Sequence, residues 1–340
     1  MKKKTWMMLP LLLLCSHLVS GQVIDSVKFF KDETLIEMSL TTDIKALQSE
    51  KKFDVFQDAD VTLSFPDSPV INQKIAVGAR GHFRRDFCTI PPLMLNFRGP
   101  GSRLSSLGKL KLVIGCGNKA DDEQLILKEY LAYKMYNLLE EKSFRVRLVR
   151  VTYNDSRNKM RPFTQYAFFI EDDADMARRN GCVKKDKVQV LTESTNRDMM
   201  TMVAVFEYMI SNGDWSVPNN HNIKLIFEKK IPAALPYVVP YDFDHSGFVN
   251  AGYALPNELL GTETVTERVY RGFPREMEEL ESVFAEFRQK KESIYALIMN
   301  FSLLKERTRK DAVEYLEDFY KTINNKGQVK SIFIDNARTK

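Results

Sequence analysis

The N-terminal half of the chain alternates apolar and polar residues, a pattern that restricts it to strands with one buried face. The alternation runs between Val23 and Phe65 and is clearest in residues 34–40 and 59–65. Period two is the repeat of a β-strand, in which successive side chains point to opposite faces. Further strands are predicted at residues 73–80, 93–97, 109–114, 145–153 and 165–170.

Helical periodicity interrupts this pattern once and dominates the chain after residue 171. Apolar residues recur at helical spacing from Leu127 to Leu138, behind Asp121 and Asp122, which are suited to cap a helix. Strands that cluster first and helices that cluster later are typical of an α+β protein. Later helices are predicted at residues 195–211, 275–300 and 303–325, and two short strands at residues 222–227 and 237–239.

These patterns predict the organisation of the chain. We expect a β-rich N-terminal lobe with one central helix at residues 22–170, and a mainly helical C-terminal lobe at residues 171–325. A C-terminal tail at residues 326–340 follows the last predicted helix.

The first 21 residues have the three-part layout of a cleavable secretory signal. Lys2, Lys3 and Lys4 form a positive start, residues 6–14 are almost wholly apolar, and small residues at positions 19–21 follow. The apolar run is too short for a membrane anchor, which needs about 20 apolar residues. We therefore expect export to the periplasm, the cell surface or the exterior, with no transmembrane anchor after cleavage.

Charge and cysteine content narrow the function classes. Removal of the three signal-peptide lysines lowers the formal charge from +5 to +2, which argues against a nucleic-acid partner. The spacings of Cys88, Cys116 and Cys182 match no zinc signature. In an oxidising compartment two of the three can form a disulfide, but the sequence does not choose the pair, and buried free thiols are the alternative.

Two polar segments beside short apolar strands are the candidate site. Residues 212–222 contain Asp214 and end at Asn222, and residues 240–247 contain Asp242 and Asp244. Loops at strand ends commonly carry catalytic groups, and oxygen ligands suit Mg²⁺. Phosphoryl transfer would use Asp214 as the base, Asn222 (or Asn219) as the amide ligand and Asp242 as the metal carboxylate. Asp244 would bind a second ion or brace the loop, and the alternative reading of both segments is plain turns.

Other candidate groups are less specific. Arg80, Arg84 and Arg85 form a basic cluster suited to phosphate, although a solvated strand end has the same composition. His82, His221 and His245 lie in or near the polar segments, but the sequence has no HExxH zinc motif and no GxSxG nucleophile elbow.

Several short motifs, in order along residues 75–250, resemble the CotH-type (spore coat protein H-like) atypical kinases, especially exported bacterial members of that group. They are Asp214-Trp215 with a following Asn and strand, Pro240-Tyr-Asp-Phe-Asp, Arg80-Gly81 ahead of Pro91-Pro92, Glu129-Tyr-Leu-Ala-Tyr, and residues 166–171. The resemblance implies a two-lobed, atypical kinase-like fold that binds nucleotide between its lobes.

By the same resemblance, Glu129 would pair with a lysine that holds the ATP phosphates, with Arg80 in the N-terminal part of that site. Lys111 is the preferred lysine because its predicted strand leads directly into the helix of Glu129; the alternative is a solvent-facing strand residue. The chain departs from the family where it has Pro91-Pro-Leu-Met-Leu in place of a Lys-Lys pair, and it has no glycine-rich phosphate loop.

The sequence therefore supports three hypotheses. The first is an exported CotH-like phosphotransferase that uses Mg²⁺ and ATP on an unknown protein or small-molecule acceptor. The second is a catalytically inactive relative that serves as a binding or structural protein of the cell envelope. The third, a glycan-handling protein, rests only on aromatic content.

Overall fold

The computed structural model describes residues 25–338, apart from residues 51, 53, 67, 82–87, 89, 100–101, 118–119 and 186–187. The predicted signal peptide and the candidates His82, Arg84 and Arg85 lie outside the described residues. Among the residues that are described, no helix is both long and apolar enough to cross a bilayer.

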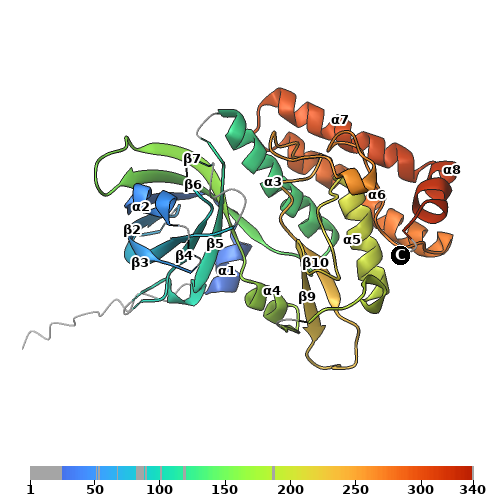
Figure 1. The fold of residues 1–340 in the computed structure, drawn as a ribbon, viewed down its shortest axis with the longest axis horizontal. Coiled ribbons are helices and arrows are strands. Elements are labelled where there is room, and N and C mark those ends of the chain that lie inside the picture. The colour runs from blue at the N-terminus through green and yellow to red at the C-terminus, as the bar shows by residue number, and fades with distance from the viewer. Residues whose placement is uncertain are drawn as a thin grey trace, which may run out of the picture.

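Seven strands of the N-terminal region close into a barrel, in the order β1-β2-β3-β4-β5-β7-β6 (Figure 1). Neighbouring strands are antiparallel except at the closure, where β1 and β6 pair in parallel with Ile36 opposite Val149. The strands are β1 (Ile36–Thr42), β2 (Gln57–Ser64), β3 (Ile71–Ala79), β4 (Leu93–Asn96), β5 (Lys109–Ile114), β6 (Val146–Asp155) and β7 (Phe163–Ile170).

The expected two-lobed, kinase-like α+β fold is wrong, because this closed barrel takes the place of a kinase-like lobe made of a sheet and a helix. Alternating residues identify strands but not their partners. An open sheet would leave two strands with unpaired backbone groups, and the β1–β6 pairing removes both edges. The positions of the predicted strands are confirmed; the way they assemble is not.

Two short helices lie where the sequence predicted only strands. They are α1 (Ser26–Lys31) and α2 (Ile44–Ser49). The Asp25 side chain accepts a hydrogen bond from the Lys28 backbone N–H at 3.0 Å, and Asp43 accepts one from the Ala46 N–H at 3.0 Å. These N-caps satisfy backbone N–H groups that a helix start otherwise leaves unpaired, which stabilises even a short helix before or between strands.

The helix α3 (Ala120–Leu139) links the barrel to the rest of the chain and contacts β6, β7 and α6. A disulfide joins Cys88, in the β3–β4 connection, to Cys116, in the turn before α3, which settles the pairing that the sequence left open. Cys182 is a buried free thiol.

The C-terminal region packs helices around a three-stranded antiparallel sheet of order β10-β9-β8. The strands are β8 (Cys182–Lys184), β9 (Ile223–Glu228) and β10 (Tyr237–Pro240). The helices are α4 (Asp173–Arg179), α5 (Arg197–Met209), α6 (Met277–Met299), α7 (Glu306–Ile323) and α8 (Lys326–Val329), followed by a π-helical turn, η5 (Lys330–Asp335). Short 3₁₀ turns are η2 (Ser105–Leu107), η3 (Thr192–Ser194) and η4 (Glu258–Leu260).

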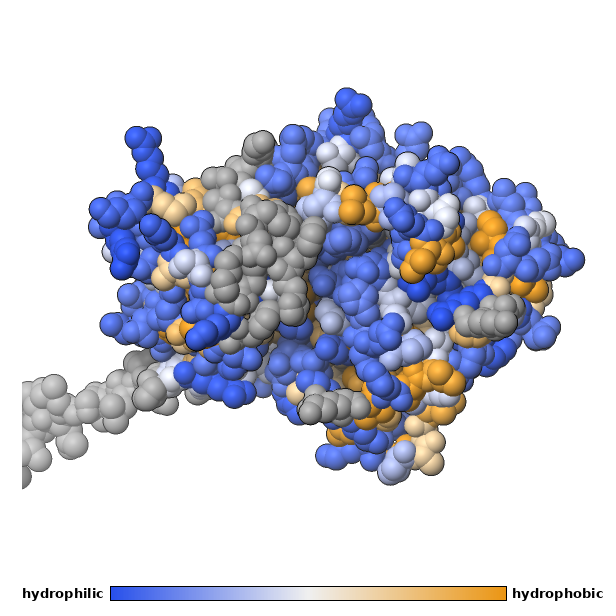
Figure 2. All heavy atoms as spheres, in the orientation of Figure 1, coloured by the Kyte–Doolittle hydropathy of each residue, from blue (hydrophilic) through white to orange (hydrophobic). Residues whose placement is uncertain are grey.

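The described residues form two hydrophobic cores that share a wall. Ile114 and Phe169 belong to the barrel core, whereas their neighbours Val113 and Phe168 belong to the helical core. This follows from strand geometry, since adjacent side chains of β5 and β7 point to opposite faces. Figure 1 shows α3 between the barrel and the C-terminal helices, and Figure 2, in the same orientation, shows mostly hydrophilic residues on the described surface.

Candidate functional site

Pairing of β9 with β10 brings the two polar segments together. Asn222 immediately precedes β9 and Asp242 follows β10, and the Tyr241 backbone N–H donates to the Asn222 carbonyl at 3.0 Å. Because the strands are antiparallel, the start of one lies beside the end of the other. Asn222 and Asp242 both have left-handed backbones, with φ of 52° and 66°. Asn and Asp tolerate this conformation better than most residues, which favours them at these positions.

The Asp214 carboxylate is held in place by two side chains of the same loop. The His221 Nε2 lies 2.8 Å from Asp214 Oδ1, and the Asn222 amide donates to Asp214 Oδ2 at 3.0 Å and to the Asp214 carbonyl at 2.7 Å. The Asp214 N–H in turn donates to Asn212 Oδ1 at 3.0 Å. The Asp214 side chain is 41% exposed, so this oriented carboxylate remains accessible. The sequence had singled out His221 without assigning it this contact.

The Asp242 backbone is anchored to α3. Its N–H donates to the Tyr133 hydroxyl at 2.8 Å, and the neighbouring Phe243 ring packs 4.7 Å from the Tyr133 ring, centroid to centroid. Burial, followed by the charges of Glu129 and Asp242, raises the pKa of Tyr133, which therefore stays a neutral hydroxyl. Glu129 is buried one turn before Tyr133 on the same helix, so α3 connects Glu129 with the Asp242 loop.

Asp244 lies in a different environment from Asp242. It is buried, and its Oδ2 accepts a hydrogen bond from the Tyr253 hydroxyl at 2.9 Å. This contact ties the loop after β10 to the segment that follows it. Of the two roles considered for Asp244, the geometry favours bracing the loop.

The residues at the strand ends carry oxygen atoms of the kind that Mg²⁺ prefers as ligands. The Asn222 Nδ2 is directed at Asp214, which leaves Asn222 Oδ1 as the oxygen donor, and Asp242 supplies a carboxylate. The described residues contain no group of three His, Cys, Asp or Glu side chains placed to hold a metal. Mg²⁺ does not need one, since it commonly binds one or two protein carboxylates together with water and substrate phosphates.

Next to this site, basic side chains from separate elements surround the Tyr241 ring. The Nζ atoms of Lys111 on β5 and Lys224 on β9 each lie 5.2 Å from the centroid of that ring. Asp173 lies at the start of α4, and its Oδ2 forms an ion pair with the Lys184 Nζ at 3.2 Å. The same oxygen lies 3.9 Å from the Lys224 Nζ. We call Arg80, Lys111 and Lys224 the cationic cluster; its position next to Tyr241 places it beside Asp242.

The charges in this cluster favour an anionic ligand. Burial and then the charge of Arg80 lower the pKa of Lys111 to about 8, with Lys224 adding to the effect and Asp173 and Asp242 opposing it. Although burial acts to raise it, the charges of Lys111, Lys184 and Lys224 hold the pKa of Asp173 below its usual value. Like charges near a desolvated lysine are stabilised when an anion binds among them.

Sequence reasoning missed Lys224 and Asp173. Lys224 interrupts the apolar strand 223–227, and a lone charge in such a strand is the signal that could have identified it. Asp173 carried no comparable signal. The acids whose charges act on Lys111 are Asp173 and Asp242; the pairing of Lys111 with Glu129 stays a prediction from the family resemblance.

Arg271 is a further residue that the sequence did not identify. Its Nη1 donates to the Gly213 carbonyl at 2.5 Å and to the Trp215 carbonyl at 2.6 Å, on either side of Asp214. Its guanidinium lies 5.2 Å from the centroid of the Trp215 ring. Arg271 thereby fixes the backbone that carries the candidate base.

No family model and no curated protein matches this chain.

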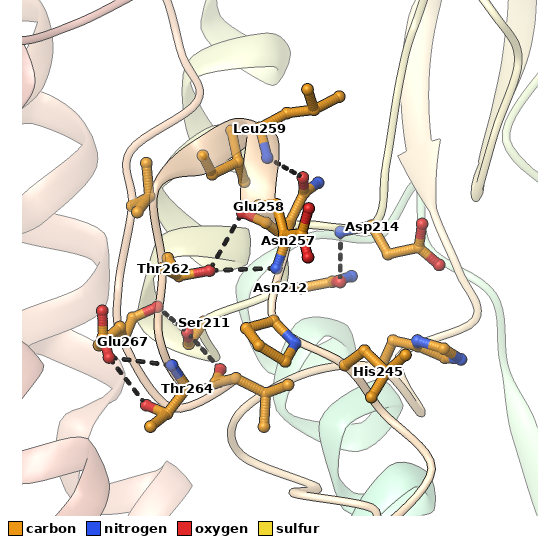
Figure 3. Close-up of a pocket in the computed structure, with 16 residues that line it drawn as sticks. Ser211, Asn212, Asp214, His245, Asn257, Glu258, Leu259, Thr262, Thr264 and Glu267 are labelled. Carbon is orange, nitrogen blue, oxygen red and sulfur yellow. Dashed lines mark hydrogen bonds between the residues drawn. The ribbon is translucent and has the colours of Figure 1, made fainter.

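A cavity of about 330 Å³ lies next to Asp214 (Figure 3). Residues 211–214 and His245 form one part of its wall, and the segment from Leu255 to Val269 forms the rest. Asp214 is thus the residue shared by the candidate catalytic loop and an adjoining space large enough for a small molecule.

Proposed function

We propose that the protein is an exported, CotH-like phosphotransferase that uses Mg²⁺ and ATP. The observation that carries this proposal is the arrangement at the ends of β9 and β10. There, an accessible Asp214 carboxylate held by His221 and Asn222 lies beside Asp242 and the cationic cluster. The proposal rests on this local geometry and on the sequence motifs, and it does not require a kinase-like fold.

Asp214 acts as the base in this proposal. It accepts the proton of an acceptor hydroxyl while the hydroxyl oxygen forms a bond to the γ-phosphorus of ATP. The bond between that phosphorus and the β–γ bridging oxygen breaks, so the products are ADP and a phosphate ester. His221 and Asn222 keep the carboxylate oriented, which reduces the reorganisation needed for proton transfer.

Asn222 Oδ1 and the Asp242 carboxylate would hold Mg²⁺, which when bound neutralises charge on the ATP phosphates. Lys111, Lys224 and Arg80 supply positive charge to the same phosphates. Tyr133 supports the Asp242 loop from α3.

The first experiment is thermal unfolding of the mature chain, residues 22–340, with and without saturating ATP and Mg²⁺. A ligand at about 100 times its dissociation constant stabilises a protein by about 2.7 kcal/mol. We expect a rise in the midpoint that requires both ATP and Mg²⁺ and is lost in Asp242→Ala. Asp60→Ala, an exposed acid on β2, is the matched control and should keep the full rise. A rise that persists in Asp242→Ala would contradict the proposed site.

Absence of any rise would favour the second hypothesis, a catalytically inactive binding or structural protein of the cell envelope. The specific observation on its side is the Pro91-Pro-Leu-Met-Leu segment, which stands where the family tends to have two lysines. In that case the cationic cluster would serve to bind an anion without transferring phosphate.

A further inference from the structure

The cavity beside Asp214 differs in charge from the cationic cluster. The described residues that line it include three acids, Asp214, Glu258 and Glu267, and no lysine or arginine. Its apolar lining comes mainly from leucine, valine and proline side chains between Leu255 and Val269. A ligand suited to these walls has a carbon skeleton and a positive charge.

The cavity and the cationic cluster are linked through the catalytic loop. Lys111 and Lys224 contact the Tyr241 ring, and Tyr241 hydrogen-bonds to Asn222. Asn222 in turn holds Asp214, which lines the cavity. Asp214, the proposed base, therefore lies between the cationic cluster and the cavity. A transfer between two substrates requires the base to lie between their binding sites.

The acids of the cavity have different roles. The Glu267 carboxylate accepts from the backbone N–H groups of Glu263 and Thr264, at 3.2 and 3.0 Å, and so folds its own loop. Glu258 begins the 3₁₀ turn η4 and is exposed. In Figure 3, Glu258 comes from this turn and Asp214 from the loop after α5, and the Asp214 carboxylate points away from Glu258 in that view. Glu258 is thus the acid placed to meet a ligand charge.

We propose that the cavity binds the phosphate acceptor, and that this acceptor is a small hydroxylated amine, such as an amino sugar. Its hydroxyl lies at Asp214 and its ammonium group at Glu258, while the apolar residues contact its carbon skeleton. This inference rests on the proposed function, because it identifies the ligand of the cavity as the molecule that accepts the phosphate. A cavity of about 330 Å³ suits one such molecule, and an anionic acceptor would be repelled by the three carboxylates.

The test measures binding of glucosamine to the mature chain by ligand-observed NMR, in the absence of ATP, with glucose as the neutral probe of the same shape. Glucosamine is expected to bind about threefold more tightly than glucose, because its ammonium group gains a contact with the exposed Glu258 carboxylate. Glu258→Gln should remove that preference. Glu263→Gln is the control, since Glu263 is an exposed acid of the same loop that is not among the lining residues.

Equal binding of glucose and glucosamine, or an unchanged preference in Glu258→Gln, overturns the inference. Binding of a serine-containing peptide in place of either sugar also overturns it. Because no ATP is present, these outcomes are independent of the ATP-dependent rise in midpoint, so failure of the acceptor assignment is distinguishable from failure of the proposed function. A final measurement adds Mg²⁺ and ATP and follows release of ADP. Release that depends on glucosamine and is lost in Asp214→Asn supports both the acceptor assignment and the proposed function.

Discussion

Glu207 shows how a single buried carboxyl supports the loop that carries the candidate base. It is 1% exposed on α5, and its backbone carbonyl accepts the Asn212 N–H at 2.8 Å. Burial raises the pKa of Glu207 to about 8; the Asn212 amide and the Arg271 charge oppose this, and the Asp214 charge adds to it. At neutral pH the folded protein therefore keeps a proton on Glu207 that the unfolded chain would release.

This predicts that Glu207 makes stability depend on pH. Its pKa is about 8 in the folded state against an ordinary value of 4.5, so its stabilising effect is complete below pH 4.5 and is lost as the pH rises toward 8. The slope is at most about 1.4 kcal/mol per pH unit. In Glu207→Gln the decline in the free energy of unfolding between pH 6 and 8 should be smaller. Urea unfolding of both proteins at the two pH values measures it, and parallel slopes would contradict the prediction.

At the scale of elements, the candidate site consists of loops that connect strands and helices and lie close together. The Cys88–Cys116 disulfide joins the β3–β4 connection, which begins at Arg80, to the turn before α3. The same helix holds Asp242 through Tyr133. The disulfide thus links the segment of Arg80 to the helix that supports Asp242, the proposed magnesium ligand.

Removal of this disulfide should lower stability. It spans a sequence separation of 28 residues, and closing a loop of that size stabilises a folded protein by about 2–4 kcal/mol, mainly by restricting the unfolded chain. We expect a Cys88→Ser/Cys116→Ser double variant to lose about this much in urea unfolding. Dithiothreitol should lower the midpoint of the wild type toward that of the variant and leave the variant unchanged; a variant as stable as the oxidised wild type would refute the prediction.

At the scale of the whole molecule, the barrel and the helical region share β5 and β7 as a common wall. Alternate residues of these strands contribute to the two cores, as Val113 and Ile114 do. Loss of either core exposes one face of the shared strands, so neither core is expected to remain folded without the other.

The shared wall predicts one cooperative unfolding transition. Leu95 in the barrel and Leu316 on α7 are both fully buried, and replacement of either by alanine should cost about 2–5 kcal/mol. Both variants should shift the same single transition in calorimetry. Leu255→Ala, at a site that is 76% exposed, is the control and should shift it little. Two separate transitions, each sensitive to one variant, would show that the cores unfold independently.

The positions of most strands and helices followed from the sequence because burial periodicity is local. Residues 109–114 alternate and form β5, and residues 195–211 carry a helical pattern and contain α5. The short α1 and α2 did not follow, since one capped turn is too brief to show a period. At the site, Asp214, Asn222 and Asp242 could be selected because each lies in a polar segment that adjoins a short apolar strand.

What the sequence by itself determined is therefore the positions of the longer helices and most strands, together with the polar residues near their ends. Only the tertiary structure decided the barrel closure, because the parallel pairing of β1 with β6 joins strands that are far apart in the chain. The same holds for Lys111 and Lys224, which meet at Tyr241 from different elements, and for the cavity between Asp214 and Glu258. Periodicity reports which face of an element is buried, whereas partners, charge clusters and cavities depend on contacts between distant segments.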